Sequence, residues 1–371
     1  MKTNNLSVYP YLARFQSLKK FFKKIDKNRV YSNFGSLYDL CENKVKRFLQ
    51  LKKKNIIFTS SGFSSLLACL LYIKNKNKQK KYCIIPAFSF SASVHSAVLS
   101  GLEPFFVDIS KDTLHPDVDC LKSVPNYIIK NTACIMLVSP FGYFLSADKI
   151  NGIFSKFKIP IVYDAADSFL NLKSVDSLNK NIFISCSFHP TKTLPANESG
   201  LIICHKNFKS EIRSLVNFGI MNSDRNIRQV AINGKFSEYD AAIFLANYNL
   251  IGSIKKYVKK NNQIYRENFK NIKFFELFNN VNRNYISNKT LVLSRNIFYA
   301  KKIKKIFFYK KIFMYLPWGK KLICHEKPFK KYKKTKLNVS ERIIRTYFFL
   351  PNYYSISKKK IFHYCKILTK V

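Results

Sequence analysis

Two side chains near the middle of this sequence have the type and the spacing for chemistry on a carbonyl group. Asp164 follows a short apolar run that predicts a strand, Pro160–Tyr163, and Lys192 comes after the next such run of the chain. A carboxylate in this position can keep a pyridine-type nitrogen protonated, which turns the ring into an electron sink. A lysine that is partly shielded from water can attack a carbonyl carbon and form a Schiff base.

Both residues also have an ordinary explanation. Asp164 could cap the N-terminus of a helix, and Lys192 is one of 54 lysines, most of which are expected on the surface. Lys192 differs from most of them in its setting. Between Tyr82 and Gly200 there are nine Lys and no Arg against ten Asp plus Glu, so this third of the chain is about neutral. A lysine among apolar and hydroxyl residues there is a better candidate nucleophile than one in the basic flanks.

Residues 60–65, SSGFSS, predict a small-residue turn between a strand and a helix. Free backbone N–H groups at a helix start, together with serine hydroxyls, suit a phosphate group. Gly62, Phe63 and Ser64 are therefore candidate phosphate contacts, and Ser187, at the end of a later strand, could add a hydroxyl. An ordinary helix N-cap would explain the serines of this turn about as well.

Three further places lie at strand ends or helix starts. Phe90, in the PAFSF segment at 86–90, could stack on a flat ring, although a core phenylalanine is the commoner explanation. His189 is interpreted as structural. Residues 233–238, NGKFSE, predict a turn followed by a helix start with Ser and Glu near its capping positions.

From about residue 56 onward, short apolar runs alternate with helical segments, which is typical of an α/β sheet. Two helices are expected early in this region, Leu66–Ile73 and Ser91–Leu99. The expected strands are Ile56–Phe58, Tyr82–Pro86, Phe105–Asp108, Ala133–Val138, Pro160–Tyr163 and Ile182–Ser187, with Leu201–Cys204 as a hairpin return.

The C-terminal part of the chain predicts a different arrangement. Apolar positions at helical spacing indicate one long helix over Glu238–Phe269. Two short strands, Phe307–Phe313 and Thr346–Leu350, and a final helix, Ser357–Leu368, are expected after it. We therefore predict two domains, and their bounds are 1–247, with an N-terminal arm at 1–30, and 248–371.

Composition limits the classes of partner. The formal net charge of +44 by itself suggests a nucleic acid or an anionic membrane, but lysine dominates it, whereas base readout relies on arginine. We interpret it as compositional drift and expect no specific nucleic-acid partner. The longest apolar stretches are too short for a membrane span, and we see no signal peptide. Nine scattered cysteines without a CxxC pair favour reduced thiols over a disulfide framework or a zinc site, so a cytoplasmic protein without a metal is expected.

Taken in order, these segments resemble the DegT/DnrJ/EryC1/StrS family of sugar aminotransferases. The resemblance covers the chain from residue 32 onward and is weakest over about 245–335. The matching motifs are SGFSSL at 61–66, PAFSFSAS at 86–93, FFVDIS at 105–110, PFG at 140–142, YDAADSF at 163–169, SFHPTK at 187–192, ESGLII at 198–203, NFGI at 217–220, NGKFSEYDAA at 233–242 and SERIIRTYFFLP at 340–351.

The resemblance implies a fold, a cofactor and a set of residue roles. The fold is type I of the pyridoxal-5'-phosphate (PLP) dependent transferases: a mostly parallel sheet in a three-layer α/β/α large domain, plus a small C-terminal α+β domain. Lys192 would carry PLP as a Schiff base, and Asp164 would pair with the ring nitrogen. Asn233 would reach the cofactor of the neighbouring subunit, which implies a homodimer with shared active sites. The cofactor-binding residues are Gly62, Phe63, Ser64, Phe90, Asp164, Asp167, Ser187, Lys192 and Asn233.

Three positions depart from the family pattern. Phe63 stands where the family usually has threonine, which leaves phosphate binding more dependent on the backbone and Ser64. Asp167 stands where a glutamine commonly touches the phenolic oxygen of the cofactor. The usual G-E-G-G turn is NESG at 197–200, which loses flexibility near Lys192.

The function that this resemblance implies is the transfer of an amino group from an amino acid, glutamate, to a nucleotide-linked keto-deoxysugar for cell-surface glycan or lipopolysaccharide synthesis. Two alternatives stay open. A PLP-dependent sugar dehydratase would be similar in sequence, but those enzymes carry histidine in place of Lys192. A basic, non-catalytic binding protein on the same scaffold would not hold PLP.

Overall fold

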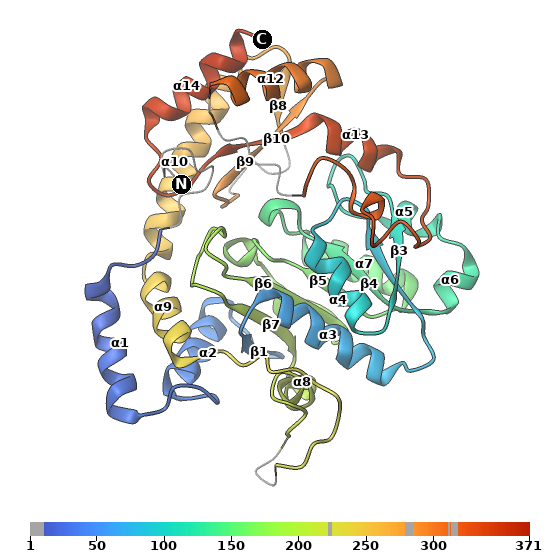
Figure 1. Cartoon of the computed structure of the whole chain (residues 1–371), viewed down its shortest axis with the longest axis vertical. Coiled ribbons are helices and arrows are strands. Elements are labelled where there is room, and N and C mark those ends of the chain that lie inside the picture. The colour runs from blue at the N-terminus through green and yellow to red at the C-terminus, as the bar shows by residue number, and fades with distance from the viewer. Residues whose placement is uncertain (1–10, 222–224, 279–284, 311, 313–317) are drawn as a thin grey trace.

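The computed structural model of the chain describes residues 11–221, 225–278, 285–310, 312 and 318–371. A seven-stranded sheet forms its centre, in the order β1-β7-β6-β5-β4-β2-β3 (Figure 1). Neighbours from β3 to β6 pair in parallel, whereas β7 is antiparallel to both β6 and β1. The strands are β1 (Lys54–Thr59), β2 (Tyr82–Pro86), β3 (Glu103–Val107), β4 (Thr132–Val138), β5 (Ile161–Asp164), β6 (Ile182–Ser187) and β7 (Gly200–His205).

Helices cover both faces of this sheet, so the predicted three-layer α/β/α fold is confirmed. Successive residues of β1 point to opposite faces: Ile56 and Phe58 join one buried core and Ile57 joins the other. The first core includes residues of α2 (Ser36–Phe48), α5 (Val118–Lys122), α6 (Asn126–Lys130), α7 (Ala147–Phe157) and α9 (Glu238–Tyr248). The second includes residues of α3 (Gly62–Lys76), α4 (Ser91–Leu99) and α8 (Lys209–Leu215).

A second, antiparallel sheet in the order β10-β9-β8 forms the C-terminal α+β part. Val292, Ile303 and Phe348 belong to its separate buried core. We propose that the two domains divide at 247/248, one residue before α9 ends at Tyr248 and shortly before the next helix begins at Ile251. The elements are α10 (Ile251–Phe269), β8 (Phe275–Leu277), β9 (Lys289–Ser294), α12 (Ile297–Tyr309), α13 (Asn338–Thr346), β10 (Tyr347–Pro351) and α14 (Lys358–Thr369).

The strand predicted at Phe307–Phe313 is wrong. Residues 307–309 are the last turn of α12, and residues 311 and 313 lie outside the described residues. Helical spacing that begins ten residues earlier outweighs the local preference of aromatic residues for strands, because Ala300, Ile303 and Phe307 all face the core. Asn296 starts the helix by accepting a hydrogen bond from Tyr299 N at 3.1 Å.

The expected long helix over Glu238–Phe269 is two helices, α9 and α10, and β8 and β9 were not predicted at all. The N-terminal region also contains more structure than an arm. Residues 1–10 lie outside the described residues, but Phe15–Asn28 form α1, which packs beside α9 (Figure 1). Every helix that the structure describes is too short or too polar to cross a membrane.

The predicted helix start at 233–238 is confirmed, with one unexpected partner. The Ser237 hydroxyl accepts a hydrogen bond from Asp240 N at 3.0 Å and so caps α9. The Glu238 carboxylate is buried and accepts hydrogen bonds from Leu37 N at 2.8 Å and Tyr38 N at 2.9 Å, in the first turn of α2. This carboxylate therefore links α9 to α2. Its negative charge also interacts favourably with the positive end of the α2 helix dipole.

One buried histidine gives the fold a specific sensitivity to acid. His115 Nδ1–H donates to the carbonyl of Thr113 at 2.7 Å, and its Nε2 accepts from the Tyr163 hydroxyl at 2.6 Å. The Tyr163 oxygen accepts in turn from Leu145 N at 3.0 Å. Complete burial lowers the pKa of His115 from its usual 6.5 to about 3.

We expect stability to fall between pH 6.5 and pH 3 in a way that His115→Gln reduces. In this window the histidine of the unfolded chain gains a proton, whereas that of the folded chain does not. The free energy of unfolding should therefore fall by up to about 1.4 kcal/mol per pH unit from this group. Urea unfolding of both proteins at pH 7 and pH 4.5 measures the effect, and the carboxylates common to both cancel. Equal losses in the two proteins would contradict it.

Candidate active site

The carboxyl ends of β5 and β6 bring the predicted residues of the site together. Asp164 is the last residue of β5, Ser187 is the last residue of β6, and the two strands pair in parallel. Lys192 follows in the loop after β6. A cavity of about 310 Å³ lies here, and its lining includes Ser61, Gly62, Phe63, Phe90, Asp164, Asp167, Ser187, His189, Lys192, Lys289 and Trp318. Ligand sites at this edge of a parallel sheet are a general property of open α/β folds.

Asp164 is buried and forms part of the wall of this cavity. Its Oδ2 accepts a hydrogen bond from the Ser93 hydroxyl at 2.6 Å, and its Oδ1 accepts from Ala166 N at 3.2 Å. Burial raises the pKa of the Asp164 carboxyl, and Ser93, Lys192 and Ala166 offset only part of the rise. The alternative that Asp164 caps a helix is wrong, since the next helical turn starts at Phe169. A cation beside this carboxylate would stabilise its charged form.

The turn between β1 and α3 closes onto the end of β6. Ser61 is the N-cap of α3 and accepts a hydrogen bond from Ser64 N at 3.0 Å. A side chain at Gly62 would place its Cβ 2.6 Å from the Ser187 Cβ, so glycine is needed for this close approach. The start of a 15-residue helix and a serine hydroxyl therefore face the same small space, which suits a phosphate group.

Of four other residues predicted to bind the cofactor, two line the cavity and two do not. Phe63 and Phe90 line the cavity, and Phe90 is 47% exposed, so its ring is not a core ring. The Ser64 hydroxyl instead hydrogen-bonds the hydroxyls of Ser60 and Ser61, each at 3.0 Å. Asn233 is exposed and is not among the residues that line this cavity.

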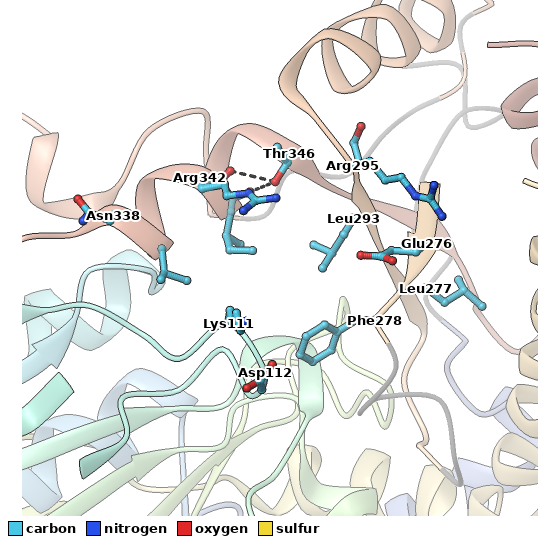
Figure 2. Close-up of a pocket in the computed structure, with 13 residues that line it drawn as sticks. Lys111, Asp112, Glu276, Leu277, Phe278, Leu293, Arg295, Asn338, Arg342 and Thr346 are labelled. Carbon is cyan, nitrogen blue, oxygen red and sulfur yellow. Dashed lines mark hydrogen bonds between the residues drawn. The ribbon is translucent and has the colours of Figure 1, made fainter. Parts of the chain in front are cut away.

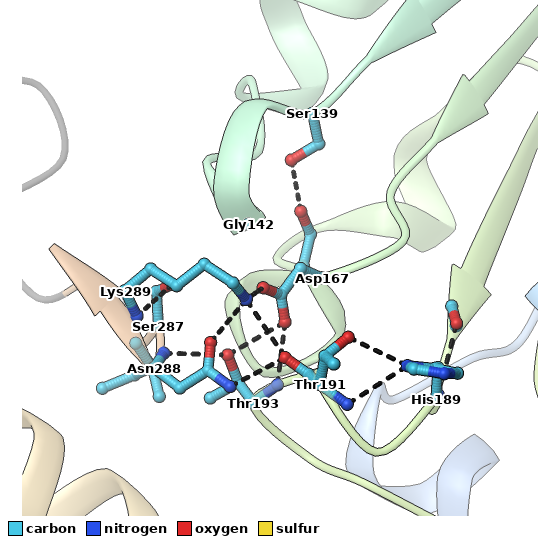
Figure 3. A network of polar contacts seen from close by, with 12 residues as sticks. Ser139, Gly142, Asp167, His189, Thr191, Thr193, Ser287, Asn288 and Lys289 are labelled. Carbon is cyan, nitrogen blue, oxygen red and sulfur yellow. Dashed lines mark hydrogen bonds and ion pairs between the residues drawn. The ribbon is translucent and has the colours of Figure 1, made fainter. Parts of the chain in front are cut away.

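Asp167 lines the cavity, but its carboxylate already has partners. Oδ1 accepts hydrogen bonds from Thr193 N at 2.8 Å and from the Thr193 hydroxyl at 3.0 Å, and Oδ2 is 2.9 Å from Lys289 Nζ (Figure 3). Burial would raise the pKa of Asp167, but the charges of Lys289 and Lys192 outweigh burial and hold the pKa below its usual value.

His189 organises the lysine loop. Its Nδ1 accepts a hydrogen bond from Thr191 N at 3.2 Å, and its Nε2 lies 3.2 Å from Glu198 Oε1. Burial lowers the pKa of His189, against the opposing effect of Glu198. The turn at 197–200 is the one that differs from the usual G-E-G-G pattern. Asn197 adopts a left-handed conformation there, at φ 57°, which asparagine tolerates better than most residues do.

Three residues of the site were missed in the sequence. Ser93 lies inside the quoted PAFSFSAS motif, so a hydroxyl near Asp164 could have been found there. Trp318 is the only tryptophan of the chain and lies against Phe88 and Phe141, at ring-centroid distances of 4.5 and 4.4 Å. Lys289 lies in the stretch where the motifs fade, and no local signal separates it from the other lysines.

A larger cleft, of about 720 Å³, lies elsewhere, between the loop at 111–112 and the second sheet with α13 (Figure 2). Lys111, Arg295 and Arg342 line it, all three of them exposed. None of the residues expected to carry chemistry is part of this lining. Size alone therefore does not locate the active site, and we assign it to the smaller cavity.

The smaller cavity fits PLP by the chemistry of its groups. The α3 start and Ser187 would hold a phosphate, Asp164 would meet a protonated ring nitrogen, and the exposed ring of Phe90 would cover a flat face. Lys192 supplies the amine that an aldehyde requires. Within the described residues no group of three or more His, Cys, Asp or Glu is arranged to hold a metal ion.

Comparison with known sequences also indicates an aminotransferase. The sequence model of the DegT/DnrJ/EryC1/StrS aminotransferase family matches residues 16–369. The chain is 29% identical over 265 residues to a dTDP-4-amino-4,6-dideoxy-D-glucose transaminase of Shigella dysenteriae, covering 71% of this chain and 70% of that protein. It is 32% identical over 165 residues to a UDP-2-acetamido-2-deoxy-3-oxo-D-glucuronate aminotransferase of Pseudomonas aeruginosa, covering 44% and 45%.

Solved structures with the same fold are also similar over the whole chain. Helicobacter pylori PseC, an aminotransferase involved in the biosynthesis of pseudoaminic acid, has a TM-score of 0.86 at 17% identity and covers 99% of this chain and 98% of its own. DesI, solved in the presence of its TDP-sugar product, has a TM-score of 0.86 at 19% identity, with 100% and 93% covered. At these identities the similarity establishes the fold.

Proposed function

We propose that this chain, which belongs to the DegT/DnrJ/EryC1/StrS aminotransferase family, transfers an amino group from glutamate to the ketone of a nucleotide-linked deoxysugar. The observation that carries the proposal is that Lys192 and Asp164 line one cavity together with Gly62, at the start of α3, and Ser187. The relatives named above as transaminases of dTDP- and UDP-linked sugars support a nucleotide-linked acceptor. We further propose a cytoplasmic enzyme of cell-surface glycan or lipopolysaccharide synthesis.

In this proposal six of the lining residues would bind PLP. Ser187 and the backbone N–H groups of Gly62 and Phe63 would hold the phosphate, and Phe90 would stack on the ring. Lys192 would carry the cofactor through Nζ, and Asp164 would keep a proton on the ring nitrogen. When bound, PLP supplies an electron sink for the electron pair left at the α-carbon of the amino donor.

The residues of the chain then move protons and exclude water. Once the amine of the donor has displaced it from the cofactor, Lys192 Nζ would be free to take the proton from the α-carbon of the donor. In the second half of the reaction it would deliver a proton to the carbon that receives the amine. Asp164 stabilises the charge on the ring throughout, and Ser93 holds its carboxylate in place at 2.6 Å. Trp318 and Phe141 form an apolar wall of the cavity, which suits the weakly polar face of a deoxysugar.

A panel assay tests the transfer. The purified chain, loaded with PLP, is incubated with glutamate and with 3-keto and 4-keto deoxysugars linked to dTDP, UDP or GDP. We expect 2-oxoglutarate and an amino sugar nucleotide to appear in equal amounts for at least one acceptor, as measured by mass spectrometry. Lys192→Ala is the control that should produce neither. Loss of water from the sugar without amine transfer would favour the dehydratase alternative instead.

We also propose a homodimer in which Asn233 serves the cofactor of the partner subunit. Asn233 is exposed, and the neighbouring Gly234 carbonyl accepts a hydrogen bond from Ser60 N at 2.8 Å, so this segment borders the phosphate turn. Light scattering should find a dimer, and Asn233→Ala should weaken PLP binding by about tenfold or more while the dimer persists, since one hydrogen bond to a charged group is lost. A stable monomer that keeps full activity would contradict this.

A further inference from the structure

A buried network links Asp167 to the lysine loop and to the second sheet (Figure 3). Asp167 follows β5, Thr193 directly follows Lys192, and Lys289 is the first residue of β9. The Asp167 carboxylate accepts both hydrogen bonds that Thr193 donates and pairs with Lys289 Nζ at 2.9 Å. Three segments that are far apart in sequence therefore meet at one carboxylate.

Lys289 makes hydrogen bonds in addition to this ion pair. Its Nζ also donates to Asn288 Oδ1 at 2.7 Å and to the carbonyl of Thr191 at 3.1 Å. Asn288 adds two hydrogen bonds to the same loop: its side chain donates to the Thr191 carbonyl at 2.9 Å, and its N–H donates to the Thr193 hydroxyl at 3.1 Å. Thr191 and Thr193, the residues on both sides of Lys192, are thus hydrogen-bonded to the start of β9.

A lysine side chain that is only 6% exposed is unusual and needs its charge to be matched. Burial lowers the pKa of Lys289, Asp167 counteracts that fall, and the charge of Lys192 lowers the pKa further. Lys289 and Lys192 are therefore close enough to act on one another, and both act on Asp167. The titratable groups that face this pair of lysines are Asp164, Asp167 and His189, with Glu198 beside His189 and Tyr285 beside Asp167.

We propose that Lys289 is a positioning residue that pairs with the Asp167 carboxylate, so that Lys192 is not drawn into an ion pair there and its amine stays available to the cofactor. The inference rests on the proposed function, because it concerns the amine that PLP requires. Lys192 and Lys289 line the same cavity as Asp167 and Asp164, and the charges of both lysines act on the Asp167 carboxylate. Lys289 occupies Oδ2 of Asp167 and Thr193 occupies Oδ1, so both oxygens of this carboxylate already have partners other than Lys192. Without Lys289, the uncompensated Asp167 would attract a proton to Lys192 and hold it there.

Covalent attachment of PLP as a function of pH measures this directly. Only the neutral amine of Lys192 attacks the aldehyde carbon, and water leaves as the carbon–nitrogen bond forms. The protein is mixed with PLP at pH 6 to 10, the bond is reduced with borohydride, and the labelled fraction is found by intact mass. Wild type is compared with Lys289→Met, Asp167→Asn and the double variant. Lys209→Met is a matched control, because it breaks another partly buried ion pair, with Glu42 at 2.7 Å.

We expect the two single variants to shift in opposite directions. In Lys289→Met the midpoint of attachment should rise by about one pH unit, so that attachment below the midpoint falls about tenfold. In Asp167→Asn the midpoint should fall, because two ammonium groups then face no carboxylate at Asp167. The double variant should return toward the wild-type midpoint, and Lys209→Met should not move it.

The opposite shifts keep the inference testable even if one variant folds poorly. A lower labelled fraction at every pH with an unchanged midpoint would mean that Lys289 only holds the structure, and would overturn the inference. Equal midpoints in wild type and Asp167→Asn would overturn it as well. Absence of label in the wild type at every pH would overturn the proposed function, and this inference with it.

Discussion

Lys192→Ala is expected to lose covalent PLP and all transamination while the chain still folds. Borohydride reduction of the wild type should attach the phosphopyridoxyl group to the peptide that contains Lys192. In the proposed function the amine of Lys192 both carries the cofactor and moves the proton, so no second residue would replace it. Loss of a catalytic group of this kind costs several powers of ten in rate, at about 1.4 kcal/mol for each tenfold step.

The variant should keep its stability because Lys192 is half-buried at a cavity wall and fills no core space. Lys156→Ala is the matched control: it removes an exposed lysine of α7 from the same charge-neutral third of the chain. Peptide mapping and circular dichroism measure label and fold in both. Lys192→His adds a second test, since it introduces the residue of the related dehydratases and should also abolish transamination. Label on another lysine, or transamination that persists in either variant, would refute the assignment.

Asp164→Asn is expected to keep PLP bound and to lower turnover by several orders of magnitude. Asparagine has nearly the same shape and still offers one oxygen to Ser93 or Ala166, but it cannot hold a proton on the ring nitrogen. The ring would then stabilise the electron pair at the α-carbon poorly, which should cost several kcal/mol in the proton-transfer step. Single-turnover kinetics with glutamate measure the loss.

Two further measurements separate this effect from misfolding or cofactor loss. Trp318 is the only tryptophan and lines the cavity, so quenching of its fluorescence by PLP reports cofactor binding in the variant independently of turnover. Asp117→Asn is the control, because Asp117 caps α5 by accepting from Cys120 N at 2.9 Å, and asparagine caps a helix equally well. Near-normal turnover in Asp164→Asn would show that the carboxylate has a structural role only.

The motifs of the site could be found in the sequence because each is short and lies at the end of a strand. An apolar run followed by Asp164, and a later one followed by Ser187 and Lys192, are local patterns. The parallel pairing of β5 and β6 then places them at one edge of the sheet by a general rule of α/β folds. The alternation of strands and helices predicted the three-layer domain for the same reason, since it depends on periodicity over a few residues.

Predictions from local patterns were wrong where the same residues could form either of two secondary structures. The aromatic residues around Phe307 favour a strand by propensity, but the helix that begins at Ile297 continues through them and buries one face against the second sheet. The break between α9 and α10 was also hidden, because apolar positions keep a helical spacing on both sides of it. In each case the contact with the core decides, and that contact is not local.

The sequence by itself therefore determined the family, the large domain and the two residues expected to do the chemistry. The tertiary structure alone decided what surrounds them. Lys289 is about a hundred residues from Lys192 in a divergent stretch, and only the packing of β9 against the lysine loop brings its ammonium 2.9 Å from Asp167. Trp318 reaches the cavity in the same way, from the C-terminal part of the chain. Burial turns such distant pairs into strong interactions, because charges that lose water must be compensated by whatever the fold places beside them.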